Sequence, residues 1–177
     1  MEDSVNYAEY TVDQKAEGKF GIKKKLFVLG YILFCVGGFA FFLSIGFYPI
    51  GTIWPFATFI LVGFTWRYVQ LEKKTEVVNA HFRISEIYGR KKQKTIFECL
   101  VSELSVIAPM DEAHQAQWET ADTVIDHRGS VKAQDTYFAR LEKDGKSTVV
   151  YFEAITKMVK VMKFYNSKNT VVTELRY

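Results

Sequence analysis

The sequence predicts a membrane-embedded helical hairpin followed by a soluble α+β domain, in which a small antiparallel sheet or barrel is capped by an amphipathic helix. Three observations predict this fold class. Residues 26–66 contain no charged residue and no histidine, alternating apolar runs follow between residues 76 and 153, and the apolar period becomes helical after residue 155. We therefore expect a short cytoplasmic N-terminal segment (1–25), the hairpin (26–68) and one cytoplasmic domain (75–177).

The uncharged stretch is long enough to cross a bilayer twice. A hydrocarbon core about 30 Å thick requires roughly 20 apolar residues of helix. The 41 residues from Leu26 to Trp66 are broken once, by the turn-forming residues 48–52, which predicts helices at about 26–47 and 53–68. A polar lead-in and a second apolar block distinguish this stretch from a cleaved signal peptide, so we expect both helices to be retained.

The charges that flank the hairpin predict its orientation. Lys23, Lys24 and Lys25 precede the first helix, Arg67 and the lysine pair at 73–74 follow the second, and the connecting turn is uncharged. Positively charged flanks tend to stay on the cytoplasmic side of a membrane. We therefore expect a multi-pass protein of the cell membrane with both termini in the cytoplasm.

Small residues recur along the first predicted helix. Gly30, Gly37 and Ser44 are spaced by seven residues, which places them on one face where another helix can approach closely. We expect this face to pack against the second helix at Thr58 and Thr65, with packing on another membrane protein as the alternative. No charged or strongly polar residue lies at mid-membrane depth, which disfavours a channel or transporter.

The soluble part is expected to consist of strands closed by one helix. Strands are predicted at 76–84, 86–88, 94–100, 104–108, 136–142 and 147–153. Asp144-Gly145 supplies the residues that a tight hairpin turn needs between the last two strands. From Ile155 to about Tyr165 the apolar residues follow a helical period. The polar stretch 110–134 is expected to be a long loop, or a loop with a short helix around 112–119.

This order of elements resembles that of pleckstrin-homology-like (PH-like) domains, in which antiparallel strands are followed by a capping helix. The chain also resembles small bacterial membrane proteins that combine a two-helix hairpin with a C-terminal PH-like domain. The resemblance covers almost the whole chain, through the lead-in 7–25, the hairpin, the strand ending at 107–109, and Val150–Glu153 running into a helix that ends at Asn166. It implies a PH-like fold and no particular activity, since no lipid-binding signature matches residue by residue.

Two surface features are candidate binding sites. Arg90, Lys91, Lys92 and Lys94 follow Gly89 in a predicted loop and are candidate lipid-contact residues, because each cation near an anionic leaflet contributes about 1 kcal/mol. The alternative is a solvated loop. Nucleic acid is not expected as a partner, since the patch is small and lacks interleaved aromatic residues.

The second feature is Trp118, which stands alone in a polar segment. It is a candidate protein-interaction residue, or it folds back onto the sheet.

We expect no catalytic residue, cofactor or metal site. The sequence contains no phosphate-binding glycine loop and no nucleophile elbow. Cys35 and Cys99 are too isolated for a disulfide framework or a zinc site. Cys99 could meet His81 across neighbouring strands, although a strand cysteine is usually a core residue. The carboxylates between 111 and 126 lack the pattern of a calcium loop and indicate an exposed acidic surface.

Three functions remain open at this stage. The favoured one is a non-enzymatic, membrane-anchored scaffold or accessory subunit that binds a protein partner or a second copy of itself. The alternative is a peripheral sensor of anionic lipid that acts through the basic loop Arg90–Lys94. The third is an enzyme, which would need a concave pocket with groups of perturbed acidity.

Overall fold

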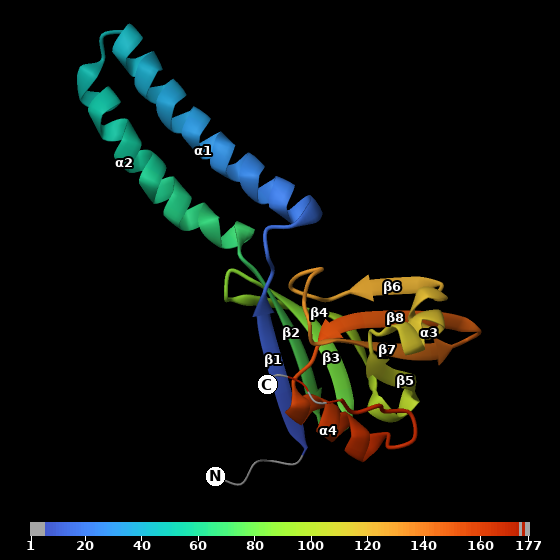
Figure 1. Cartoon of the computed structure of the whole chain (residues 1–177). Coiled ribbons are helices and arrows are strands. Elements are labelled where there is room, and N and C mark those ends of the chain that lie inside the picture. The colour runs from blue at the N-terminus through green and yellow to red at the C-terminus, as the bar shows by residue number, and fades with distance from the viewer. Residues whose placement is uncertain (1–5, 174, 176–177) are drawn as a thin grey trace. The chain divides into compact units, whose positions relative to one another are not determined.

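The computed structural model describes residues 6–173 and residue 175 (Figure 1). The chain divides into two compact units. The sheet unit consists of residues 1–14, 72–87 and 93–177, and the hairpin unit consists of residues 15–71 and 88–92.

The sheet unit contains two four-stranded sheets, which do not close into a barrel within the described part of the chain. In the first sheet the strands follow in chain order: β1 (Tyr7–Asp13), β2 (Leu71–Val78), β3 (His81–Tyr88) and β4 (Lys92–Leu100). The second sheet has the order β5 (Leu104–Pro109), β7 (Thr136–Lys143), β8 (Lys146–Glu153) and β6 (Thr123–Asp126). β6 runs parallel to β8, so the prediction of a purely antiparallel sheet is wrong at this edge.

Two turns show how the residues determine the strand pairs. Asp144 and Gly145 both have positive φ, 54° and 72°, and connect β7 to β8 as predicted. Asn79 and Ala80 also have positive φ, 48° and 68°, and they separate β2 from β3. The single strand predicted over 76–84 is therefore wrong. The apolar alternation on either side of the two-residue turn hid this break, although asparagine is one of the residues that tolerate this backbone region.

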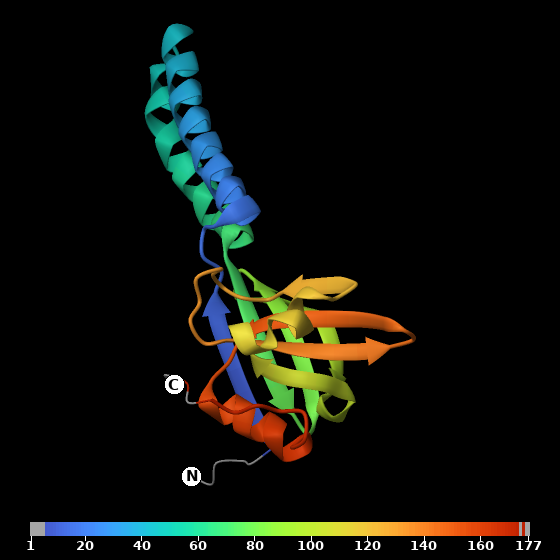
Figure 2. The same cartoon turned by 45° about the vertical axis from the view of Figure 1, so that its right-hand side comes forward.

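The core of the sheet unit lies between the inner faces of the sheets and helix α4 (Thr156–Tyr165), which Figure 2 shows beside the ends of the strands. Phe82 and Phe152 pack with their ring centroids 5.1 Å apart. From α4, Met158, Val159 and Met162 are fully buried against this cluster, whereas the lysines at 157, 160 and 163 are exposed. Each fully buried apolar side chain contributes about 1.5–3 kcal/mol. The predicted amphipathic helix is confirmed.

The N-terminal segment is part of the sheet unit. β1 pairs antiparallel with β2 from Tyr7↔Val78 to Asp13↔Glu72, and Ala8 is buried in the core. The segment 1–25 predicted as a separate lead-in therefore supplies an edge strand and the first residues of a helix. As a consequence, the whole helical hairpin is an insertion between two neighbouring strands of one sheet.

The hairpin unit contains α1 (Gly18–Ser44), α2 (Tyr48–Thr65) and the 3₁₀ turn η1 (Trp66–Val69). α1 begins well before Leu26, and the turn between the helices falls at 45–47 instead of 48–52. Gly46, at φ +75°, takes the left-handed conformation needed there, and Pro49 fits the first turn of α2 because its missing N–H is not required. Both α1 and the span 48–69 are long and apolar enough to cross a membrane.

The two helices pack at Gly38 of α1, which faces Trp54, and at Gly51 of α2, which faces Phe42 and Leu43. The side of Gly38 where a Cβ would project is filled by the Trp54 indole. Trp54 Nε1 also donates a hydrogen bond to the Phe34 carbonyl at 3.0 Å, and the Tyr31 and Thr65 hydroxyls lie 2.7 Å apart. The α1 glycine at this contact is therefore Gly38, whereas the spacing in the sequence predicted Gly30 and Gly37.

The predicted contact of Gly30 and Gly37 with the second helix is not formed. A Cβ at either position would meet no atom within 4 Å. Ser44 is exposed and its hydroxyl donates to Phe41 O of its own helix. Gly38, one residue after Gly37, faces α2 instead. The face formed by Gly30, Gly37 and Ser44 is therefore turned away from α2. Packing of that face on another membrane protein stays a prediction.

Candidate membrane-contact site

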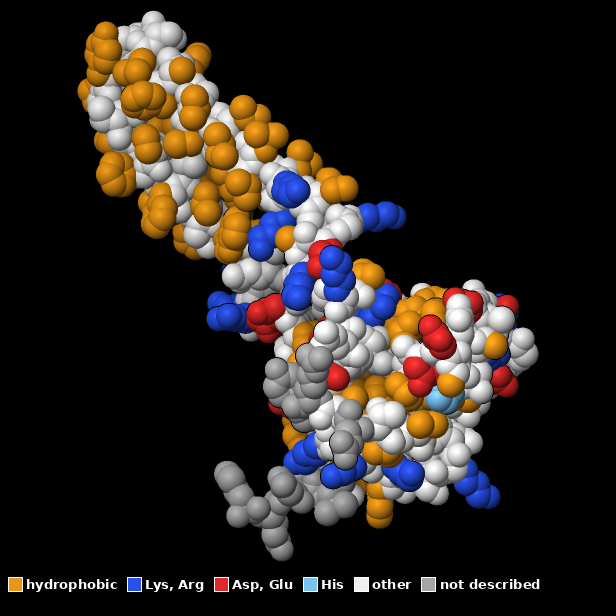
Figure 3. All heavy atoms as spheres, viewed as in Figure 1, with side chains coloured by type: hydrophobic (Ala, Val, Ile, Leu, Met, Phe, Trp, Pro, Cys, Tyr) orange, Lys and Arg blue, Asp and Glu red, His pale blue; other side chains and the backbone are white. Residues whose placement is uncertain are grey.

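Charge is distributed very unevenly between the two units. The hairpin unit holds nine of the 23 Lys and Arg residues but only one of the 20 Asp and Glu residues, Glu17. Its formal net charge is therefore +8, and the remaining residues carry −5, which together give the +3 of the whole chain. Figure 3 shows basic side chains at the base of a hairpin covered by hydrophobic side chains. The modest overall charge conceals a strongly basic and a clearly acidic part.

The apolar surface of the hairpin is exposed. Within the most apolar window of each helix, 0% of the α1 residues and 11% of the α2 residues are buried. Side chains such as Phe56 and Phe59 are 71% and 79% exposed. A core helix of a soluble protein would be mostly buried, and an apolar surface of this extent marks an interaction with protein or membrane. α1 follows β1, a strand that pairs within the sheet unit, so the residues before this helix form part of the fold.

Aromatic and basic side chains meet at the base of the hairpin. Lys24 Nζ lies 5.6 Å from the centroid of the Trp66 ring, and the Arg67 guanidinium lies 5.1 Å from the Tyr68 ring centroid. Such cation–π contacts orient the charged groups. Tryptophan and tyrosine prefer the headgroup layer of a bilayer, so the base of the hairpin has the composition of a membrane–water interface.

The basic turn between β3 and β4 is fixed to this base. Gly89 has φ +57°, its N–H donates to Gln70 O at 3.1 Å, and a Cβ there would lie 2.7 Å from Arg67 Cβ. Only glycine permits this approach. Arg90, Lys91 and Lys92 are exposed immediately after it.

Three of the four predicted lipid-contact residues therefore lie in the hairpin unit. The fourth, Lys94, is exposed on β4 in the sheet unit. Sequence reasoning found the basic run but not Arg67 as its neighbour, because this contact joins residues far apart in the chain.

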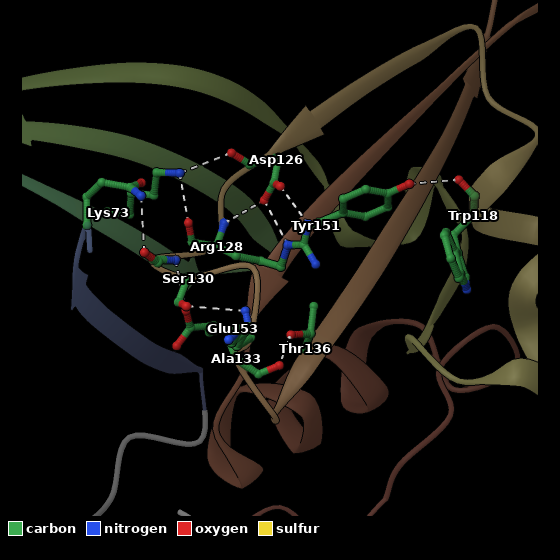
Figure 4. Close-up of polar contacts among 12 residues, drawn as sticks. Lys73, Trp118, Asp126, Arg128, Ser130, Ala133, Thr136, Tyr151 and Glu153 are labelled. Carbon is green, nitrogen blue, oxygen red and sulfur yellow. Dashed lines mark hydrogen bonds and ion pairs between the residues drawn. The ribbon is translucent and has the colours of Figure 1, made fainter. Parts of the chain in front are cut away.

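A second polar cluster lies in the sheet unit, on the loop after β6 (Figure 4). Lys73 of β2 is 8% exposed, and its Nζ donates to the carbonyls of Asp126 and Arg128 at 3.1 and 2.8 Å. Burial lowers the pKa of Lys73. Arg128 contacts both carboxylate oxygens of Asp126, at 2.9 and 2.6 Å. Although burial acts to raise the pKa of Asp126, these hydrogen bonds outweigh it and the pKa is lowered.

The same loop is held by His127 and Gly129. His127 is 2% exposed, its backbone N–H donates to Tyr151 O at 2.8 Å, and its Nε2 lies 3.2 Å from Lys74 O. Burial, reinforced by the nearby Lys73 ammonium, lowers the pKa of His127 to about 4. Gly129 N–H donates to Glu153 Oε1 at 2.8 Å. These groups bind carbonyls and carboxylates of adjacent segments, so the cluster fastens the loop across both sheets.

Trp118 folds back onto the second sheet. It lies on the short helix α3 (Gln115–Glu119), which confirms a short helix in the segment 110–134. Its ring is perpendicular to that of Tyr151 with centroids 6.0 Å apart, and the Tyr151 hydroxyl donates to Trp118 O at 3.0 Å. Trp118 is half-buried, and its role in protein binding stays a prediction.

Cys99 and His81 do not form a pair. Cys99 faces the core, where burial raises the pKa of its thiol to about 12. His81 is exposed, with Nδ1 3.7 Å from a carboxylate oxygen of Glu98. Strand alternation places residues 98 and 99 on opposite faces of the sheet. Cys35 and Cys99 are both free thiols. Across the described residues, no three His, Cys, Asp or Glu side chains gather closely enough to hold a metal ion.

Two sheets capped by a C-terminal helix, with an apolar helical hairpin inserted between the first two strands, define a PH-like domain that carries its own candidate membrane anchor. The chain belongs to the family described as Bacterial PH-like domain (DUF6106), which it matches over residues 3–172. The match extends from before β1 to beyond α4, so both apolar helices lie within the matched domain. Comparison with curated proteins gave no match. Comparison with solved structures also gave none.

Proposed function

We propose that this protein is a non-enzymatic, membrane-anchored PH-like module. The hairpin spans the cell membrane, both termini lie in the cytoplasm, and the basic base of the hairpin binds anionic headgroups of the inner leaflet. The observation that carries this proposal is the division of charge, with +8 on the unit that contains the apolar helices and −5 on the rest.

The basic residues are placed where they act together. Arg90, Lys91 and Lys92 are held beside Arg67 by the hydrogen bond from Gly89 to Gln70. Because each cation near an anionic surface contributes about 1 kcal/mol, the three turn residues contribute about 3 kcal/mol. Charges at a surface are screened over about 10 Å at 0.1 M salt, so this attraction requires the turn to lie close to the headgroups.

Strand pairing supports an even number of membrane crossings. Asp13 at the end of β1 lies opposite Glu72 near the start of β2, and the hairpin leaves and rejoins the sheet through the short link 14–17 and through Gln70. Both ends of the hairpin are therefore tied to one strand pair. A single crossing would place β1 and β2 on opposite sides of the membrane and prevent this pairing.

The first test is extraction of membranes with alkaline carbonate. A chain that spans the bilayer stays in the pellet, and release into the supernatant would overturn the anchor.

The second test measures energy transfer from the hairpin tryptophans to dansyl-labelled phosphatidylglycerol, with the full chain reconstituted in phosphatidylcholine vesicles. We expect Arg90→Gln/Lys91→Gln/Lys92→Gln to reduce lipid enrichment by up to about a hundredfold, from about 1 kcal/mol per cation. The matched control is Lys160→Gln/Lys163→Gln/Lys168→Gln, which removes three exposed cations from the sheet unit. Equal effects of the two triple variants would refute specific headgroup binding.

A scaffold function is the second candidate, because the sheet unit carries a net charge of −5 and presents the Trp118 segment on its surface. Such a unit, held at the membrane, suits a protein partner with a basic surface. Purification of the full chain from native membranes in mild detergent tests it. The control is a chain with Asp122→Asn and Glu119→Gln, two exposed carboxylates of this segment. A stoichiometric partner that the control loses would support the scaffold, and equal recovery would argue against this surface.

A further inference from the structure

A hollow of about 430 Å³ lies along the outer surface of α1 near its N-terminal end. Gly21, Lys24, Lys25, Val28, Leu29 and Ile32 line it, with Ala16 at its foot. These helical residues recur at intervals of three and four, so they form one continuous face. At 1.5 Å per residue this face is about 17 Å long.

The two ends of this groove differ in chemistry. Lys24 and Lys25 lie at the end nearest the start of the helix, and the walls toward Ile32 are apolar. Lys24 is half-buried, and its Nζ lies 5.6 Å from the Trp66 ring centroid, which restrains the ammonium at the rim. In the proposed membrane orientation, the end of the groove at Lys24 and Lys25 therefore presents positive charge at the membrane–water interface. The other end, toward Ile32, presents an apolar surface.

The foot of the groove is closed by the chain itself. Gly21 is buried, its N–H donates to Glu17 O at 3.0 Å, and a Cβ on it would overlap the carbonyl group of Ala16. Glycine at this position lets Ala16 lie directly against the first turn of α1. The groove thus ends on the N-terminal side of Lys24 and Lys25, at Ala16 and Gly21.

We propose that this groove seats one anionic phospholipid, with an acyl chain along Val28, Leu29 and Ile32 and its phosphate at Lys24 and Lys25. The inference rests on the proposed function, since it requires the hairpin to lie in a bilayer. Charge complementarity selects the occupant. A second copy in the same membrane, related by a two-fold axis along the membrane normal, would bring its own Lys24 and Lys25 against these lysines and be repelled.

The test is native mass spectrometry of the full chain released from phosphatidylcholine nanodiscs that contain a minority of phosphatidylglycerol. We expect one phosphatidylglycerol to be retained. Leu29→Trp fills the groove and should abolish retention. Leu33→Trp is the matched control, because Leu33 is similarly exposed on α1 (63% against 51%) but does not line the groove, and it should retain the lipid.

A second variant tests the headgroup end without adding bulk. Lys24→Gln/Lys25→Gln should reduce the preference for phosphatidylglycerol over phosphatidylcholine by about thirtyfold. Arg90→Gln/Lys91→Gln/Lys92→Gln should leave the single retained lipid in place.

The outcomes separate this inference from the proposed function. Failure of the chain to enter nanodiscs would overturn the membrane anchor and the lipid seat together. Incorporation with equal lipid retention in Leu29→Trp and Leu33→Trp would overturn the seat alone. So would a dimer that Leu29→Trp dissociates, because a second copy would then occupy the groove.

Discussion

Mild acid should destabilise the sheet unit through His127. This residue is 2% exposed, and burial lowers its pKa from 6.5 to about 4. The unfolded state therefore binds a proton more readily than the folded state between these two values. The contribution of neutral His127 to the stability of the folded state is therefore fully present above pH 6.5 and is lost as the pH falls toward 4. With about 1.36 kcal/mol for each pKa unit, the free energy of unfolding should drop by about 2–3 kcal/mol between pH 7 and 4.5.

The buried thiol of Cys99 provides the assay. Its side chain lies in the core of the sheet unit, so a disulfide reagent that remains active in acid, such as 4,4′-dithiodipyridine, labels it only after unfolding. Urea titrations of the full chain in detergent, in a Cys35→Ala background, then give the free energy of unfolding at each pH. Asp126, whose pKa is lowered from 3.8, titrates below this window, and Glu9 and Glu98, whose pKa values are lowered from 4.5, contribute only at its lower end and equally in every variant.

His127→Gln should remove most of the pH dependence. Glutamine keeps an N–H that can donate to Lys74 O, so we expect a loss of about 1 kcal/mol at pH 7 and little further loss at pH 4.5. His81→Gln is the control, because His81 is exposed on the outer face of β3 and should leave the acid-induced loss unchanged. A wild-type chain of constant stability over this range, or an unchanged slope in His127→Gln, would refute the reasoning.

Three further predictions concern the packing of each unit. Gly38→Ala should weaken the pairing of α1 with α2 by about 1–3 kcal/mol, because the Trp54 indole fills the space that the new methyl group would need. Gly37→Ala should leave this pairing unchanged, because the space beside Gly37 is open. Tryptophan fluorescence during unfolding in sodium dodecyl sulfate measures both variants. In a chain that lacks β1, the disulfide reagent should label Cys99 without urea. In a chain where an Asn-Gly turn replaces residues 14–71, Cys99 should stay protected from the reagent, because the β1–β2 pair is kept. Gly145→Ala should cost about 1 kcal/mol in the urea titration, because its φ is +72° and the space around it is open.

Several elements were predictable because their signals are local. The hairpin follows from a stretch without charges, α4 from one helical period, and the β7–β8 turn from Asp144-Gly145. β1 was missed because its signal is only a short alternation, Ala8, Tyr10 and Val12, while its partner lies beyond the entire hairpin. β6 was missed for a similar reason, since a four-residue strand in a polar segment depends on pairing with β8, which lies more than 20 residues further along the chain.

The candidate site was predictable only in part. The run Arg90–Lys92 is visible in the sequence, and Lys23–Lys25, near the start of α1, are visible as charge that flanks the apolar stretch. Their relation depends on tertiary contacts, above all Gly89 on Gln70 and Arg67, which no local pattern encodes. The packing glycine was misassigned because a helical face is sensitive to phase. Gly37 and Gly38 are adjacent in sequence but point about 100° apart around the helix.

If the hairpin spans a membrane, as we propose, its insertion between paired strands couples membrane insertion to folding. β1 is made first, yet it pairs only with β2, which follows α1 and α2 in the chain. Pairing over such a separation is slow compared with local contacts, so β1 remains without its partner strand while the hairpin is synthesised. If the hairpin failed to insert with both ends on one side, β1 and β2 could not meet, and the first sheet would lose its edge strand. Under the proposed membrane anchor, correct topology is therefore a condition for completing this fold, and the β1–β2 pair keeps the sheet unit on the side where both hairpin ends emerge.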